Sequence, residues 1–284
     1  MNGTLVMIGL RRGWTEHLQF LRNRREFAGG LIGTVGIFVL VARWQGGTDV
    51  PGTHASKAVL MAAGFIAFSV FSVALMGLPM MITTDREDGA LLRLRTVPGG
   101  MPVYLVGRAV SVLGQIATYV ALMLLAGVAL TELTLPAAPG DWLTLLWVLG
   151  LGTLSVVPVG AALGTLLPGP RNAASILSLP MMGLMVVSGV MFPVTAMPEP
   201  VQWVAQAFPL YWQGLGLRSV FLPDSMLAAE IGGSWRPLET AAVLGAWAVA
   251  GLLVAPWLLR RAARRESGTR LAERQERRAA QGAF

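Results

Sequence analysis

Six long apolar runs without any Asp, Glu, Lys or Arg constrain this chain of 284 residues more than any other feature. They cover residues 27–42, 58–82, 109–130, 142–167, 172–197 and 240–259, and contain 16 to 26 residues each. As helices with a rise of 1.5 Å per residue, such runs extend about 24 to 39 Å, and the hydrocarbon core of a bilayer is about 30 Å thick. Charged residues make up only 13% of the chain, against roughly 25% in a soluble domain. We therefore expect an all-α integral membrane protein with six transmembrane helices.

The basic residues between the runs indicate an orientation. The 22 Lys and Arg residues divide 18 to 4 between alternate connecting segments, and segments 1–26, 83–108, 168–171 and 260–284 lie on the richer side. Because Lys and Arg favour cytoplasmic loops, this predicts both termini in the cytoplasm. Segment 1–26 is then a cytoplasmic leader, 27–259 the transmembrane domain, and 260–284 a basic tail that lies near anionic headgroups or is solvated. Orientation also explains the net charge of +7 better than nucleic-acid binding does.

The leader has the spacing of an amphipathic helix. Five residues recur on one helical face, while most of the basic residues lie elsewhere: Leu10, Trp14, His17, Leu18 and Leu21. This pattern predicts an interfacial helix before the first span, with an unstructured basic leader as the alternative.

Glycines at GxxxG spacing occur at Gly29/Gly33 and at Gly160/Gly164. Small residues at this spacing allow helices to approach closely. At 12% glycine such pairs also arise by chance, so they do not predict a dimer.

The sequence lacks most of the residues that enzymes and ion-driven carriers need for their chemistry. The interiors of the apolar runs contain no acidic or basic residue, whereas ion-driven carriers usually bind or relay the ion there. Asp85 and Asp88 could hold Mg²⁺ on a diphosphate, but a lipid-processing enzyme would need a second acidic cluster on the same side. The chain has no cysteine, and Lys57, its single lysine, is not in a Walker A motif. We predict no catalytic residue and no metal site, and any ATP must be hydrolysed by another chain.

Two connecting segments contain short helices by their spacing. In loop 83–108, Asp85, Glu87 and Asp88 favour the start of a helix, which Pro98 and Gly99 would end. In segment 198–222 the interruptions at Glu199, Pro200 and Pro209 leave apolar stretches too short to cross a bilayer, which predicts an extracellular re-entrant hairpin before the last span. We expect Trp203, Phe208 and Trp212 of this hairpin to face lipid or a second copy of the chain.

Three segments resemble the ABC-2 type transporter permeases, in particular the bacterial drug-resistance branch typified by daunorubicin exporters. The first is similar to the family's R-E-x-G-T-L-x-x-L-x-x-T-P loop at Arg86, Glu87, Gly89, Leu91, Leu94 and Pro98, and departs from it at Ala90 and Val97. The second is similar to its S-G-x-x-F-P segment with a following proline pair and a closing arginine, here Ser188, Gly189, Phe192, Pro193, Pro198, Pro209 and Arg218. The amphipathic leader resembles the family's connecting helix.

The resemblance implies a half-transporter in the bacterial cytoplasmic membrane. Two copies, or this chain and a sister permease, would form the pathway above two ATP-binding cassette ATPase subunits, which hold ATP and Mg²⁺. No cofactor is implied for this chain, and no nucleic acid. The implied ATPase-coupling loop contains Arg86, Glu87, Asp88, Gly89, Leu91, Leu94 and Pro98, and the implied hairpin contains Trp203, Phe208, Pro209, Trp212 and Arg218. The expected substrate is drug-like or a hydrophobic natural product, and the alternatives are a polysaccharide or a lipid-linked glycan.

Overall fold

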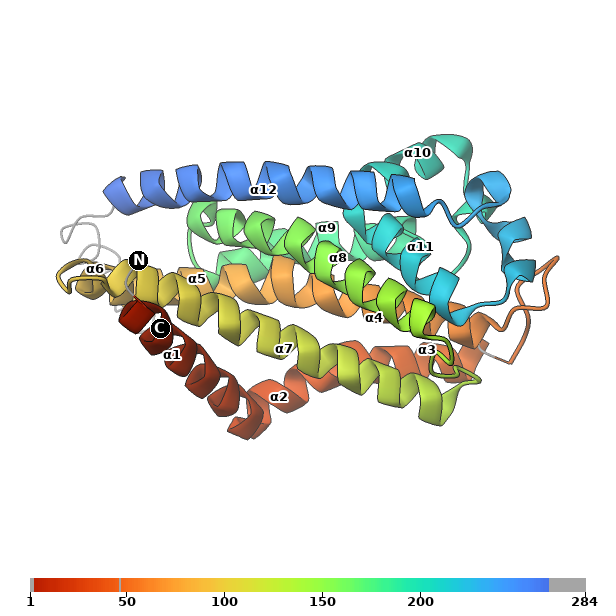
Figure 1. Ribbon diagram of the computed structural model, residues 1–284, viewed down its shortest axis with the longest axis horizontal. Helices are drawn as coiled ribbons and strands as arrows, with labels where there is room; N and C mark the ends of the chain where they lie inside the picture. Colours follow the sequence, from red (N-terminus) through yellow and green to blue (C-terminus); the bar gives the residue numbers. More distant parts are fainter. Residues whose placement is uncertain (1–2, 46, 266–284) are drawn as a thin grey trace, which may run out of the picture.

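The computed structural model describes residues 3–45 and 47–265, which form an elongated bundle of helices (Figure 1). The only β-pairing in these residues is a single antiparallel bridge between Asp49 and Ser56. The α6 end of the bundle contains the start of α1 and the end of α12, and the opposite end contains α10 and the segments between α11 and α12 (Figure 1). Most of the predicted basic tail, residues 266–284, lies outside the described residues.

Five segments of the described chain are long and apolar enough to cross a membrane. The first is α2 (Arg24–Leu31), the π-helical turn η1 (Ile32–Gly36) and α3 (Ile37–Gln45), and the second is α4 (Lys57–Ser72), the π-helical turn η2 (Val73–Gly77) and α5 (Leu78–Glu87). The others are α7 (Gly100–Leu130), α8 (Pro139–Leu166) and α12 (Pro237–Arg265), the last over Pro237–Ala255. The structure therefore has the all-α membrane architecture expected from the sequence.

The predicted run 172–197 does not form one helix. The helix α9 (Pro170–Val187) ends ten residues before the run does, and it is not among the five spanning segments. It ends there because Gly189 adopts a left-handed conformation with φ of 75°, after which the chain turns into the short 3-10 helix η3 (Val194–Ala196). An uncharged run did not reveal this turn, since glycine and proline within it carry no charge.

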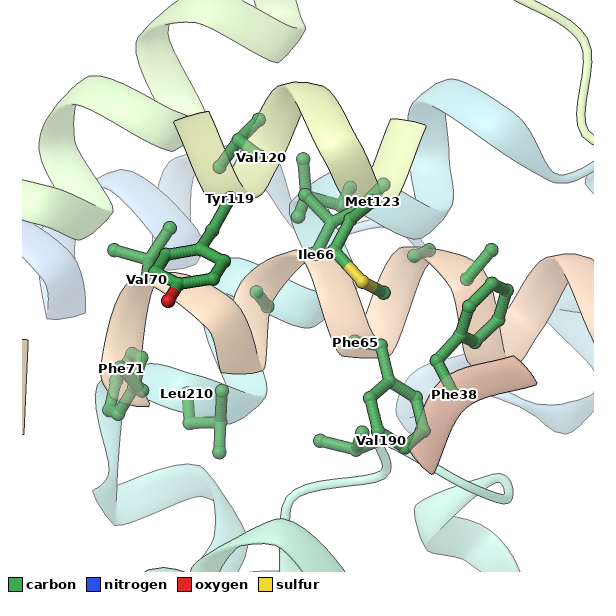
Figure 2. Close-up of a cluster of buried hydrophobic side chains, with 14 of the residues drawn as sticks. Phe38, Phe65, Ile66, Val70, Phe71, Tyr119, Val120, Met123, Val190 and Leu210 are labelled. Atoms are coloured by element: carbon green, nitrogen blue, oxygen red, sulfur yellow. The ribbon is translucent and has the colours of Figure 1, made fainter. Parts of the chain in front are cut away.

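Helix α4 is the centre of the hydrophobic core. Thirteen of its 16 residues are buried, and α3, α7, α8 and α11 (Pro209–Phe221) all pack on it. Figure 2 shows this cluster, in which Phe65 of α4 lies beside Phe38 of α3 and Val190, and Tyr119 and Met123 project from α7. A helix that is apolar on all sides and has little lipid contact belongs in the interior of a bundle.

The segment before the last span folds as two short helices, α10 (Glu199–Ala207) and α11, with the break at Phe208 as the prolines predicted. Helix α11 inserts between α4, α8 and α12, so every residue from Pro209 to Arg218 is buried. Trp203 on α10 is 67% exposed, but Trp212 on α11 is only 3% exposed, and its indole donates a hydrogen bond to the Gln206 carbonyl over 2.7 Å. The expectation that Trp212 faces lipid or a second copy is therefore wrong, because α11 packs inward.

The two GxxxG pairs differ in use. Gly160 and Gly164 of α8 lie against Ala74 and Ile82 of the second span, where a side chain at either position would collide. Gly29 and Gly33 have open space around them. Of these two pairs, only Gly160/Gly164 therefore allows close packing within the chain.

Candidate functional site

The loop between the second and third spans is built around two left-handed glycines. Helix α5 continues to Glu87, Gly89 turns the chain with φ of 69°, and α6 (Ala90–Arg95) follows. Gly99, with φ of 74°, then starts α7. The predicted short helix is present, but it starts later than expected: Asp85 and Glu87 lie in the last turn of α5 and not at the start of α6.

Carboxylates are unfavourable at the C-terminal end of a helix, so Asp85 needs a compensating charge. It has one in Arg108 of α7, with which it forms an ion pair, and it also accepts a hydrogen bond from the Tyr104 hydroxyl over 2.7 Å. Asp85 is therefore held by α7, which makes it a poor Mg²⁺ ligand. Among the described residues, no three His, Asp or Glu side chains are grouped as metal ligands.

The ion pair of Asp85 belongs to a larger polar cluster that joins α1 (Gly3–Arg22), α5 and α7. Arg108 also lies 3.4 Å from a carboxylate oxygen of Glu16, and Arg12 donates to the other oxygen of Glu16 over 2.8 Å. The guanidinium groups of Arg12 and Arg108 lie 5.4 and 5.5 Å from the centre of the Tyr104 ring, within the range of cation–π attraction. We refer to Arg12, Glu16, Asp85, Tyr104 and Arg108 as the Arg108 cluster. Sequence reasoning missed it because its members are far apart in the chain.

Helix α1 packs along α7 through glycines. Gly9 and Gly13 of α1 lie against Val106 and Val110, and a side chain at Gly13 would also meet the carbonyl of Gly107. Together with His17 and Phe20 they form the buried face of α1. The Gly9/Gly13 pair is itself a GxxxG motif, and it was a signal available in the sequence.

The other face of α1 has no partner in the described chain. It exposes apolar side chains, with Trp14 58% accessible, and the set is Met7, Ile8, Leu10, Trp14 and Leu21. An exposed apolar stripe on a helix beside membrane spans is typical of an interfacial helix. Leu10, Trp14 and Leu21 of the predicted amphipathic face are thus exposed, while His17 packs toward α7.

Arg86 ties the start of this loop to the end of α8. Its guanidinium donates to the carbonyl oxygens of Gly164, Thr165 and Leu167 at 3.2, 2.9 and 3.1 Å. An arginine in this position satisfies carbonyl groups that a helix leaves unpaired at its C-terminus. The Glu87 carboxylate lies beside Gly169, where any side chain would collide with it. Arg86 and Glu87 therefore lie against the turn between α8 and α9.

The apolar residues of α6 are only partly covered by the rest of the chain. Leu91 and Leu94 are half-buried, and Pro98 is exposed. The loop is nevertheless fixed at its far end, because Gly99 packs on Leu5 of α1 and Gly100 on the backbone of Leu94. Helix α6 is thus a small projection held by α5 and α7 at one end of the bundle, and the loop after it contacts α1 at Gly99 (Figure 1).

At the opposite end, Arg218 forms a buried ion pair. It is 1% exposed and donates to both carboxylate oxygens of Glu230, over 2.6 and 3.1 Å, and to the Gly189 carbonyl over 3.4 Å. This brings together Gly189 and Arg218, two residues of one sequence motif that are 29 positions apart. Glu230 was not predicted, because a lone glutamate in a loop has no distinctive spacing.

Residues 49–257, more than half of the chain, match a protein-family model described as ABC-2 family transporter protein. The chain belongs to this family. No curated protein is similar enough to count as a match. The matched region of this ABC-2 protein includes α6, Arg108 and the Arg218–Glu230 pair, while α1 lies outside it. As a member of the family the chain is the membrane-spanning permease of an ABC transporter.

Proposed function

We propose that this ABC-2 permease is one subunit of an exporter driven by ATP that separate ATP-binding cassette subunits hydrolyse, with ATP and Mg²⁺ bound there. The observation that supports it most is α6, a short helix with half-buried leucines that projects from one end of the bundle and is anchored on both sides. A projecting element that couples to another subunit must be fixed to the helices that it moves. Helix α6 is fixed in this way to α5 and α7.

The proposed orientation puts α6 and both termini in the cytoplasm of a bacterium, as the basic segments favour. Helix α9, with 18 residues, then serves as the fifth of six spans, since it extends about 27 Å at 1.5 Å per residue. The α10–α11 pair forms the re-entrant hairpin on the extracellular side. Arg218 holds this hairpin to Gly189 and Glu230, so that it caps the pathway.

The proposed coupling passes through the anchors of the loop. A partner ATPase that contacts Leu91 and Leu94 would push on α6, and through Gly99 on α1. The same push reaches the end of α8, because Arg86 next to this loop holds three of its carbonyl groups. Two copies of the chain, or this chain and a sister, would alternate between inward and outward access in response.

The proposed cargo is a drug-like or hydrophobic natural product, in keeping with the uncharged interiors of the spans. A polysaccharide or lipid-linked glycan is the second candidate. A membrane-embedded lipid enzyme is less favoured, because Asp85, half of its proposed magnesium site, is paired with Arg108.

The test replaces one leucine of α6 by a charge. Leu94→Asp should leave the permease folded and inserted, reduce co-purification of its ATPase at least tenfold and abolish ATP-dependent export. The matched control is Leu135→Asp, an exposed leucine between α7 and α8 at the other end of the bundle, which should behave as wild type. Normal export by Leu94→Asp at wild-type abundance would refute the coupling role of α6.

A further inference from the structure

A partly open cavity of about 550 Å³ is formed within the single chain, between the α1–α2 elbow, the second span and α7. The two π-helical turns of the described chain both line it: η1 lies on one wall through Thr34, and η2 on the other through Val73 and Gly77. π-Helical turns are rare and often occur at functional sites, because the extra residue opens the helix locally. Two of them on one cavity make it a candidate ligand site.

The position of Tyr119 depends on the glycine across the cavity. Its hydroxyl occupies the space where a side chain on Gly30 would lie, so only glycine at position 30 allows this contact. The Phe20 ring packs 5.9 Å from the Tyr119 ring, measured between centroids. The cavity thus has an aromatic wall built from α1 and α7.

The two ends of the cavity differ in polarity. Glu26, Asp85 and Arg108 line the end near the start of α2 and the end of α5, and methionines Met76, Met80 and Met81 line the walls. From Glu26 to Thr34 is eight residues, about 12 Å along a helix, which is close to the apolar depth of one leaflet of a bilayer, about 15 Å. A ligand that fits has a polar head at the membrane surface and an apolar body.

Among the side chains that line the polar end, two are acidic and one is basic, which favours a cation inside the cavity. Arg108 is already paired with both Asp85 and Glu16, which leaves Glu26 as the additional charge. The Glu26 carboxylate accepts a hydrogen bond from the Asn23 amide over 3.0 Å, and no arginine or lysine of the described chain forms an ion pair with it. A carboxylate beside aromatic rings and polarisable methionines is a suitable environment for an ammonium group on an apolar molecule.

We propose that this cavity binds an amphiphile that carries a protonated amine, with the amine at Glu26 and the apolar body among Met76, Met80 and Tyr119. Such binding needs only a single chain, and it does not depend on the proposed export. The same chemistry describes a phospholipid with an ethanolamine headgroup and a cationic amphiphilic cargo. The experiment separates these two sources.

The test measures binding of rhodamine 6G, a cationic fluorescent amphiphile, to the full-length protein in phosphatidylglycerol nanodiscs by fluorescence anisotropy at low salt. We expect one saturable site per chain. Glu26→Gln, a change at an exposed position, should weaken binding about fivefold, because one charge attraction at a partly solvated site is lost. Position 77 at the cavity wall has room for a side chain. Gly77→Phe should therefore weaken binding more than tenfold by filling the space.

The matched control is Glu132→Gln, the same substitution at an exposed glutamate after α7, at the opposite end of the bundle. It should bind the dye as wild type does. Wild-type affinity in Glu26→Gln would overturn the proposal even where Gly77→Phe fails to fold. Equally tight binding of Nile red, an uncharged amphiphile, by the wild type would overturn the assignment of an amine.

Exchange of half the phosphatidylglycerol for phosphatidylethanolamine distinguishes the sources. A severalfold loss of apparent rhodamine 6G affinity in the mixed nanodiscs, absent in Glu26→Gln, supports the site and identifies the lipid as its resident ligand. An unchanged affinity, with the variants behaving as above, supports the site and identifies a cationic cargo.

Discussion

The buried ion pair between Arg218 and Glu230 gives the sharpest stability prediction. Their side chains are 2% and 1% exposed and share two hydrogen bonds, so removing one partner leaves an unpaired charge without water. Such a loss costs about 3–5 kcal/mol, and at about 2 °C per kcal/mol it lowers the melting temperature by about 6–10 °C. We expect this loss for Glu230→Gln and also for Arg218→Met.

The assay is thermal unfolding in nanodiscs, followed by tryptophan fluorescence, as a double-mutant cycle. The double variant should be less destabilised than the sum of the two single variants by about 2–3 kcal/mol, since each single change already removes the pair. The control is Glu239→Gln in the neighbouring Arg236–Glu239 pair, where the glutamate side chain is 53% exposed and the groups are 3.7 Å apart. It should cost less than about 1 kcal/mol. Additive single effects, or a wild-type melting temperature for Glu230→Gln, would refute the reasoning.

Three further predictions concern α1 and the orientation. Gly13→Val should destabilise the protein by about 1–3 kcal/mol and expose the α1–α7 contact to hydrogen exchange, whereas Gly29→Ala, which has open space, should do neither; equal protection of α1 in both would contradict the close packing. Burial lowers the pKa of His17 from its ordinary 6.5. As the pH decreases below 6.5, the unfolded state therefore binds a proton at His17 before the folded state does, and the stability should fall. His17→Gln should flatten this pH dependence of stability between pH 5 and 7, and an unchanged slope would rule out His17 as its source. In the naturally Cys-free chain, an impermeant thiol reagent on intact cells should label a cysteine at position 225 and not one at 267, and the reverse pattern would invert the proposed topology.

Sequence reasoning worked where a property is local. Uncharged runs overlap all five membrane-spanning segments of the described chain, with ends that differ by up to nine residues, since the cost of a charge in lipid applies at each position separately. The break at Phe208 was predicted because proline at position 209 cannot continue a helix, whatever surrounds it. Family membership was likewise visible in short motifs, and the matched region confirms it.

It failed where packing decides which face of an element is buried. Trp212 was expected to face lipid or a second copy because it belongs to the predicted extracellular hairpin, yet α11 is buried on all sides between α4, α8 and α12. Run 172–197 was read as one helix, although Gly189 turns the chain so that its carbonyl meets Arg218. The burial of Trp212 depends on helices far away in the sequence, whereas the turn at Gly189 is a local break that a search for charged residues does not detect.

The sequence by itself determined that this chain is helical and membrane-embedded, where its main breaks lie and which family it belongs to, because apolar runs, prolines and motifs act over short distances. Only the tertiary structure decided that Arg86 caps α8, that Arg108 of α7 pairs with both Asp85 of α5 and Glu16 of α1, and that both π-helical turns open onto one cavity. Each of these arrangements pairs groups that are separated by tens of residues. Their free energy depends on which helices are neighbours, and spacing along the chain does not contain that information.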